Sequence, residues 1–231
     1  LEDYIGQQHL VGPGKVLRKM IDSGVVASFI LWGPPGVGKT TLAMIIAEQL
    51  KRPFYVLSAV SSGVKDVREV IQKAESQRFF NSPNPILFID EIHRFSKAQQ
   101  DSLLAAVEKG TVTLIGATTE NPSFEVISPL LSRCQVYVLK SQEKKDLEDL
   151  IDRAVEKDYY LSKRNITVKE KDAMISYSGG DARKLLNILE LVVEADDNVP
   201  VVITDDTGTR GERVRRGRYC YRQRGGTPGV A

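Results

Sequence analysis

The sequence predicts an α/β fold in which a parallel five-stranded sheet lies between layers of helices and is followed by a small helical unit. Five short apolar runs have the composition of buried strands, at residues 28–32, 53–57, 86–89, 112–117 and 135–139. Helical patterns lie between them at residues 40–49, 64–80 and 96–109. Short apolar strands that alternate with helices are typical of a parallel sheet covered on both faces.

The overall composition is that of a globular protein. Of the 231 residues, 42% are hydrophobic and 27% are charged, which excludes a collagen-like or wholly disordered chain. No apolar run approaches the ~20 residues that span a bilayer, and Glu2 and Asp3 argue against a secretory signal at this end. With only two cysteines and two histidines, neither a disulfide framework nor a histidine zinc site is expected, and the predicted location is the cytoplasm.

The third helical pattern carries signals for both of its ends. Ser96 with Gln99 three residues later predicts a capping box at its start. Gly110 predicts the residue just beyond its end, where a left-handed backbone is favoured. Together, the five apolar runs and the helical patterns between them predict that residues 1–140 form the α/β domain.

The pattern changes after residue 140. Apolar residues recur at helical spacing over 147–155 and 185–193, which predicts an all-helical unit at residues 141–203. Residues 204–231 are rich in Gly and Arg. Residues 206–231 hold seven arginines and two acidic residues, so this end carries +5 while the rest of the chain, whose total is +2, carries −3. Because this tail has no apolar pattern, we expect it to be disordered or non-native.

A glycine-rich loop follows the first apolar run. Residues 33–40 read Gly-Pro-Pro-Gly-Val-Gly-Lys-Thr, which fits the phosphate-binding pattern G-x-x-x-x-G-K-[ST]. Glycines let backbone N–H groups turn inward around phosphate oxygens, and the following helix directs its positive end at the same anion. The predicted nucleotide-binding residues are Gly33, Pro34, Pro35, Gly36, Val37, Gly38, Lys39, Thr40 and Thr41.

Two carboxylates follow the third apolar run. Asp90 is expected to hold Mg²⁺ together with the Thr40 hydroxyl, and Glu91 to take a proton from the attacking water. The fourth run ends in two threonines, and in a parallel sheet its end lies beside the acidic pair. A hydroxyl there, at Thr119, is expected to position the lytic water.

These features, in this order, resemble an AAA+ P-loop NTPase of the clamp-loader and branch-migration group. The string Ser132-Arg133-Cys134 is similar to the arginine-finger motif, so the resemblance implies that Arg133 acts on the γ-phosphate of a neighbouring subunit. The string at residues 178–183 is similar to the sensor-2 motif of the helical lid, whose arginine would be Arg183. Residues 1–12 resemble the segment over the adenine, which implies contacts from Ile5 and Gly6.

Two longer sequence strings indicate one particular family within this group. Residues 89–95 (Ile-Asp-Glu-Ile-His-Arg-Phe) and 117–124 (Ala-Thr-Thr-Glu-Asn-Pro-Ser-Phe) resemble the replication-associated recombination protein A family, which includes the Werner-helicase-interacting protein. The resemblance implies a DNA-dependent ATPase that uses ATP and Mg²⁺ in replication-fork maintenance, recombination and repair. It implies three partners: forked or junction DNA, single-strand-binding protein, and further copies of the chain as a homo-oligomer. It implies a cytoplasmic, nucleoid-associated protein, or a nuclear one in a eukaryote.

The chain departs from the family pattern after residue 205, where the C-terminal oligomerisation domain is expected and a Gly/Arg-rich stretch stands instead. This domain is therefore expected to be absent, which leaves tetramer formation open. The alternatives are a clamp-loader subunit, a Holliday-junction branch-migration motor, and a nucleotide-gated scaffold without enzymatic activity. Intact Glu91, Thr119 and Arg133 argue against the scaffold, because a scaffold has no need of all three.

Overall fold

The computed structural model describes residues 1, 4–59, 62–78, 83–195, 200–207 and 209 of the chain. By its internal contacts the chain divides into two units, Leu1–Lys140 and Ser141–Ala231. Each unit has its own apolar core and is described by itself. In the described part of the chain, no helix combines the length and the apolar character needed to cross a membrane.

The first unit is built on a five-stranded sheet in which every pair is parallel. Its strands are β1 (Phe29–Trp32), β2 (Phe54–Ser58), β3 (Ile86–Asp90), β4 (Thr113–Thr118) and β5 (Gln135–Val138). The spatial order is β2-β3-β4-β1-β5. The predicted fold class is thereby confirmed for this unit, with strand ends that differ from the sequence ranges by at most one residue.

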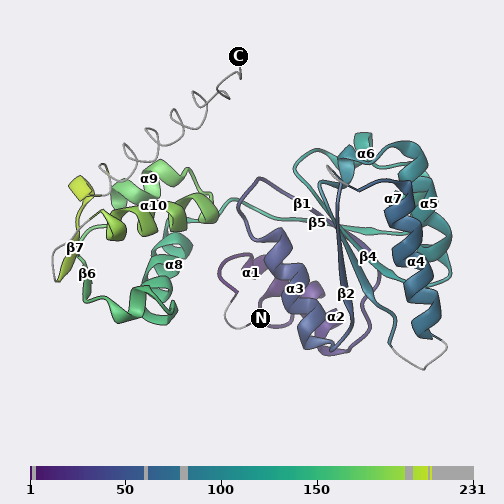
Figure 1. Ribbon diagram of the computed structural model, residues 1–231, viewed down its shortest axis with the longest axis horizontal. Helices are drawn as coiled ribbons and strands as arrows, with labels where there is room; N and C mark the ends of the chain where they lie inside the picture. The colour runs from purple at the N-terminus through teal and green to yellow at the C-terminus, as the bar shows by residue number, and fades with distance from the viewer. Residues whose placement is uncertain (2–3, 60–61, 79–82, 196–199, 208, 210–231) are drawn as a thin grey trace, which may run out of the picture. The chain divides into compact units, whose positions relative to one another are not determined.

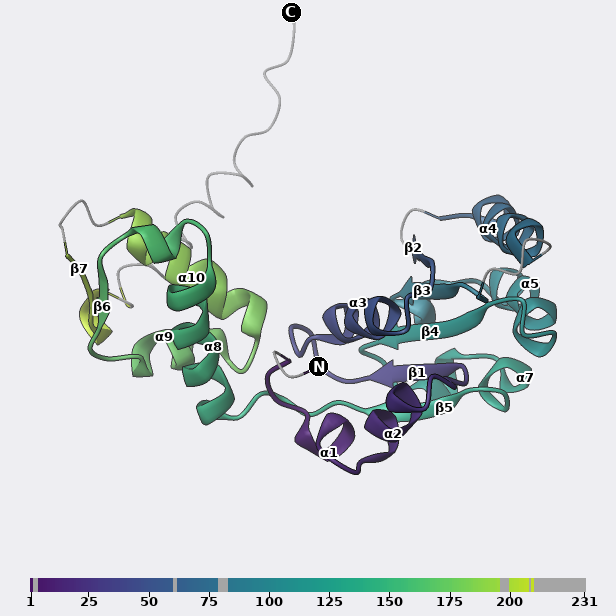
Figure 2. The ribbon, with the colours of Figure 1, turned by 90° about the horizontal axis from the view of Figure 1, so that it is seen from below.

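Helices cover both faces of the sheet. One side carries α1 (Gln8–Val11), α2 (Val16–Asp22) and α3 (Lys39–Gln49), and the other carries α4 (Val64–Arg78), α5 (Lys97–Glu108) and α7 (Ser128–Leu131) (Figures 1 and 2). Successive strand residues point to opposite faces, so Phe29 and Leu31 join one apolar core while Ile30 joins the other. This two-sided burial explains why the strands are continuous apolar runs rather than alternating ones.

The predicted ends of α5 are confirmed. The Ser96 side chain accepts from the Gln99 N–H, and the Gln99 side chain accepts in return from the Ser96 N–H. Gly110, just past the helix, has a left-handed φ of 62°. The last two residues of the helix predicted at 64–80 lie outside the described residues.

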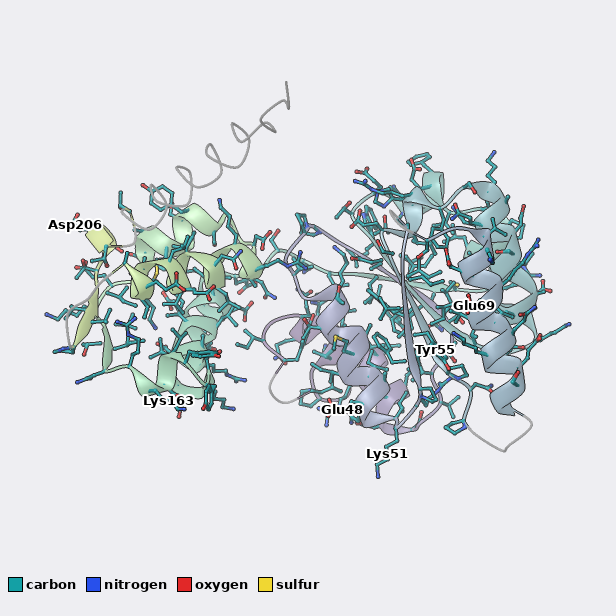
Figure 3. The ribbon with its side chains drawn as sticks, in the orientation of Figure 1. Glu48, Lys51, Tyr55, Glu69, Lys163 and Asp206 are labelled. Atoms are coloured by element: carbon teal, nitrogen blue, oxygen red, sulfur yellow. The ribbon has the colours of Figure 1, made fainter. Side chains whose placement is uncertain are left out.

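The outer surface of the helices is charged and solvated. Glu69 and Lys73 form an i,i+4 pair at 3.4 Å on α4, with both side chains more than half exposed. Lys51, just beyond α3, points away from the fold (Figure 3). Such pairs contribute little to stability, so the two buried cores hold the helices on the sheet.

The second unit corrects the expectation of an all-helical fold. It contains α8 (Lys144–Lys157), η2 (Leu161–Lys163), α9 (Asp172–Ser178) and α10 (Ala182–Glu194), but also β6 (Ile166–Val168) and β7 (Val201–Ile203), which pair in parallel. Five of the six strand residues are Ile or Val, which favour an extended backbone. Each strand has only three residues and its partner lies far away in sequence, so the pattern gave no strand signal.

The predicted tail begins later than residue 204. The Asp205 Oδ1 accepts from the Ala173 N–H at 2.8 Å, and the Asp205 N–H donates to Glu170 at 3.0 Å. Thr204 and Thr207 bond to each other through side chain and backbone. Residues up to 207 therefore belong to the second unit, and residues 210–231 lie outside the described residues.

Asp205 caps α9 from a distant part of the chain, because Ala173 lies in the first turn of that helix. We predict that Asp205→Ala lowers the stability of the second unit by about 1 kcal/mol, the usual cost of a lost helix cap. Asp205→Asn, which keeps an acceptor oxygen, should lose less than half of that. Urea unfolding followed by circular dichroism measures both, and equal stability of the alanine variant and the parent would contradict the role.

Candidate functional site

The glycine-rich loop joins β1 to α3 and has the left-handed backbone that its glycines permit. Gly36 and Gly38 have φ values of 71° and 91°, and Gly38 immediately precedes α3. Gly33 is required for a different reason: a Cβ there would lie 2.6 Å from the carbonyl oxygen of Leu139. The loop therefore ends at the N-terminus of an eleven-residue helix, where unpaired N–H groups favour an anion.

The Lys39 side chain is held at this loop. Its Nζ donates to the carbonyl oxygens of Gly33 and Pro34, both at 2.9 Å, and its residue is only 7% exposed. An ammonium group at this position adds positive charge to the helix N-terminus. Thr40 is half-buried and Thr41 is exposed, while Val37 packs into the core and Pro35 is exposed.

Tyr4 supports the loop, although the sequence analysis did not single it out. Its hydroxyl lies 3.2 Å from the carbonyl oxygen of Val37 and 3.3 Å from that of Gly38, and donates to this pair. Burial in the core raises the pKa of Tyr4, so the hydroxyl stays protonated and remains a donor at neutral pH. The sequence signal that could have identified Tyr4 is its position as an aromatic residue next to Ile5 and Gly6 in the predicted nucleotide segment.

The predicted nucleotide segment is attached to the end of the first unit. The Gln7 side chain donates to the carbonyl oxygen of Lys140 at 2.7 Å and accepts from its N–H at 2.9 Å. Gln7 is buried and has a left-handed φ of 55°, and Gly6 before it has a φ of 79°. This two-way bond holds Ile5 and Gly6 beside Tyr4, which contacts the loop.

The acidic pair occupies the end of β3. Asp90 is the last residue of the strand, and Glu91 has a left-handed backbone with φ 55° and ψ 46° before the short η1 turn (Ile92–Arg94). The Oε2 atom of Glu91 lies 3.3 Å from Nε2 of His93 and 4.0 Å from Nε of Arg94. Non-glycine residues in this backbone region carry strain, and strained residues cluster at active sites and switch regions.

The end of β4 lies between the acidic pair and the phosphate loop. In the strand order, β4 pairs with β3 on one side and with β1 on the other. Thr118 is fully buried at the strand end; its carbonyl oxygen accepts from the Gly33 N–H at 3.2 Å, and its hydroxyl lies 3.0 Å from Nδ1 of His93. Thr119, the predicted water-positioning residue, follows directly and is half-buried.

The two predicted arginines are carried by other elements than the strand ends described above. Arg133 follows α7 and is exposed; it donates to the Pro129 carbonyl oxygen at 2.6 Å and pairs with Glu108 at the end of α5. Arg183 belongs to the second unit, near the start of α10, and its residue is exposed. Their roles toward a nucleotide stay predictions.

The site has the chemistry of a nucleotide phosphate and a magnesium ion. Mg²⁺ favours one or two carboxylates together with phosphate oxygens. Asp90 and the Thr40 hydroxyl are groups of this kind, and their role toward Mg²⁺ stays a prediction. Within the described residues, no cluster of three or more His, Cys, Asp or Glu side chains could hold a metal by itself. A divalent ion here would therefore take most of its ligands from the nucleotide phosphates and from water.

Cys134 is not part of this chemistry. It lies just before β5 and is partly buried, and desolvation raises the pKa of its thiol to about 11. The thiol is therefore protonated and unreactive at neutral pH. Cys134 therefore packs as a small apolar residue; Cys220 lies outside the described residues.

Residues 29–142 match the AAA family, the ATPase family associated with various cellular activities. The chain is similar to the replication-associated recombination protein A of Haemophilus influenzae, with 50% identity over 85% of this chain and 45% of that protein. It is similar to the protein of the same name in Escherichia coli K12, with 46% identity over 92% of this chain and 50% of the relative. It is also similar to the ATPase WRNIP1 of Dictyostelium discoideum, with 47% identity over 85% of this chain and 22% of the relative.

Among solved structures, the chain resembles the RuvB Holliday junction branch migration motor of Thermotoga maritima. The TM-score is 0.72 at 29% identity, over 93% of this chain and 71% of that one. The chain spans about half the length of the bacterial relatives it matches.

Gly38 allows a direct test of the loop. A Cβ at Gly38 would lie 2.9 Å from the Tyr4 hydroxyl and would carry a φ of +91°, so Gly38→Ala should deform the loop. We predict at least a tenfold rise in the Kd for ATP, which corresponds to about 1.4 kcal/mol. Gly24→Ala is the matched control, because Gly24 also has a positive φ but open space around it. Titration with a fluorescent ATP analogue measures both; equal affinity in the two variants would contradict the prediction.

Proposed function

This chain belongs to the AAA family of ATPases, and on that premise we propose that it hydrolyses ATP to remodel DNA, or protein bound to DNA, at replication forks and during recombination and repair. The observation that carries the ATPase part is the convergence of three groups at one edge of the sheet. The phosphate loop follows β1. Asp90 ends β3 and Glu91 follows it, while Thr118 ends β4, the strand between β1 and β3, and Thr119 follows directly.

We propose these roles for the residues of the site. The N–H groups of residues 36–40 and the Lys39 ammonium bind the phosphates, and Tyr4 keeps the loop in shape. Thr40 and Asp90 would hold Mg²⁺, which when bound offsets phosphate charge. Glu91 accepts the proton of the attacking water, and the Thr119 hydroxyl orients that water. Ile5 and Gly6 contact the adenine side of the nucleotide.

We propose that Arg133 acts in trans within a homo-oligomer. Its guanidinium is on the surface at the end of α7, so a neighbouring copy can approach it. Glu108 and the Pro129 carbonyl orient the guanidinium. Arg183 is proposed to contact the nucleotide bound to its own chain. We propose a tetramer only for proteins with the full length of the bacterial relatives. This chain spans about half of that length.

The DNA part of the proposal is supported by the names of the relatives, because a recombination protein acts on DNA. Forked or junction DNA is the proposed substrate, and single-strand-binding protein is a proposed partner. The second candidate is a branch-migration motor, favoured by the RuvB likeness in fold. The greater sequence identity to the recombination proteins favours the first candidate.

An ATPase assay with and without forked DNA tests the proposal on the parent chain and two variants. Lys39→Ala should weaken ATP binding, because it removes the buried ammonium from the loop. Glu91→Gln should bind ATP normally and hydrolyse it ~10²–10⁴ times more slowly, the usual cost of losing a general base. Hydrolysis by Glu91→Gln within threefold of the parent would reject its role. Parent hydrolysis that responds to neither fork nor linear duplex would reject the DNA part.

Mixing two inactive variants tests the trans role of Arg133. An arginine finger contributes ~10³–10⁵ in rate, so Arg133→Ala alone should be nearly inactive. When it is mixed with Glu91→Gln, some interfaces combine an intact Glu91 with an intact Arg133, and turnover should return in part. Arg133→Lys, mixed with Glu91→Gln in the same way, tests whether a positive charge at this position is sufficient. Full activity of Arg133→Ala, or no recovery at saturating protein, would contradict a trans role.

A further inference from the structure

His93 lies between the proposed general base and the end of the neighbouring strand. Its Nε2 is 3.3 Å from Oε2 of Glu91, and its Nδ1 is 3.0 Å from Oγ1 of Thr118. The ring is mostly enclosed, with 13% of its side chain exposed, against 27% for Glu91. Both ring nitrogens are therefore engaged, one on the carboxylate and one on β4.

The backbone at Glu91 creates this geometry. A left-handed residue directly after β3 turns the chain into η1, so His93, two residues later, faces back onto the Glu91 carboxylate. Left-handed backbone is strained in a residue that has a Cβ. The turn is stabilised by the Arg94 N–H, which donates to the Glu91 carbonyl oxygen at 2.8 Å, and by the burial of Ile92.

Hydrogen-bond chemistry determines which nitrogen carries the proton. A carboxylate only accepts, so the Nε2 that faces Glu91 must be a donor. The Thr118 hydroxyl accepts from the Glu120 N–H at 3.0 Å, so its single proton can be donated to Nδ1 of His93. This hydroxyl is fully buried and cannot rotate away into water. It therefore holds the ring in one orientation, with the Nε2–H directed at Glu91.

We infer that His93 is a positioning residue for ATP hydrolysis: it holds one oxygen of Glu91 through Nε2 and leaves the other oxygen to receive the proton of the attacking water. The inference rests on the proposed role of Glu91 as the general base. His93 does not itself touch the nucleotide. It links the rotamer of Glu91 to Thr118, the residue before Thr119, so the base and the proposed water-orienting hydroxyl share one rigid support.

A set of variants separates this role from a merely structural one. His93→Ala should lower kcat by about 10- to 100-fold, the usual effect of losing a group that orients a catalytic one, and change the KM for ATP less than threefold. His93→Gln can place an amide donor near the Nε2 position, whereas His93→Asn can reach only the Nδ1 position. We therefore expect His93→Gln to keep a higher kcat than His93→Asn.

Arg94→Gln is the matched control. Arg94 is on the same turn and approaches the same oxygen, but at 4.0 Å and with 58% of its side chain exposed, so its loss should change kcat by no more than about twofold. A larger effect of Arg94→Gln than of His93→Ala would mean that positive charge, rather than the positioned N–H, serves Glu91. That result would overturn the inference.

The decisive measurement is the double variant with Glu91→Gln. If His93 acts through Glu91, adding His93→Ala to Glu91→Gln should change the residual single-turnover rate by less than about twofold, because the group that it positions is already gone. A further tenfold loss would show a structural role and reject the inference. Thermal unfolding of each variant checks the fold, and His93→Asn, which keeps the Thr118 contact, decides the question if His93→Ala does not fold.

The outcomes also separate the inference from the proposal on which it rests. Parental hydrolysis by Glu91→Gln would reject Glu91 as the base, and the inference with it. Slow hydrolysis by Glu91→Gln with parental hydrolysis by His93→Ala would reject only the role of His93.

Discussion

The parallel pairing of β4 with both β1 and β3 is the constraint on which the site depends. In a parallel sheet all carboxyl ends reach the same edge, and a strand placed between two others brings their loops within reach of its own end. Here the central strand ends in Thr118, whose carbonyl oxygen bonds to Gly33 of the phosphate loop and whose hydroxyl contacts His93 beside the acidic pair. One buried residue thus connects both halves of the site.

The same constraint explains the burial pattern of the sheet. Helices on both faces make every strand residue of β3 and β4 apolar or small, up to the point where the strands emerge at the edge. Gly116 illustrates how closely these layers pack, because a Cβ there would lie 3.1 Å from the Ile92 side chain. The η1 turn that carries His93 is therefore packed directly on β4, and the polar contacts of the site rest on an apolar one.

Several side chains that support the site are engaged with backbone rather than with other side chains. Tyr4 bonds to two carbonyl oxygens of the loop, and Gln7 bonds to both backbone groups of Lys140. Gln100 is buried, and it connects the carbonyl oxygens of Phe95 and Glu125 with the N–H of Ile127, the residue that precedes α7. Such bonds hold loops in place without requiring a long run of regular structure, and buried amides that are fully paired stabilise one arrangement over others.

The sequence by itself determined the strands of the sheet, the phosphate loop, the acidic pair and the capping box of α5. These features are local, because apolar periodicity, glycine spacing and a capping box between residues three positions apart are each contained in a short stretch of sequence. What only the tertiary structure decided depends on residues that are distant in the chain. The β6–β7 pair, the cap that Asp205 provides for α9, and the Tyr4 and Gln7 contacts join segments more than 30 residues apart. The role of His93 belongs to the same group, because the second partner of its ring, Thr118, comes from a strand 25 residues away.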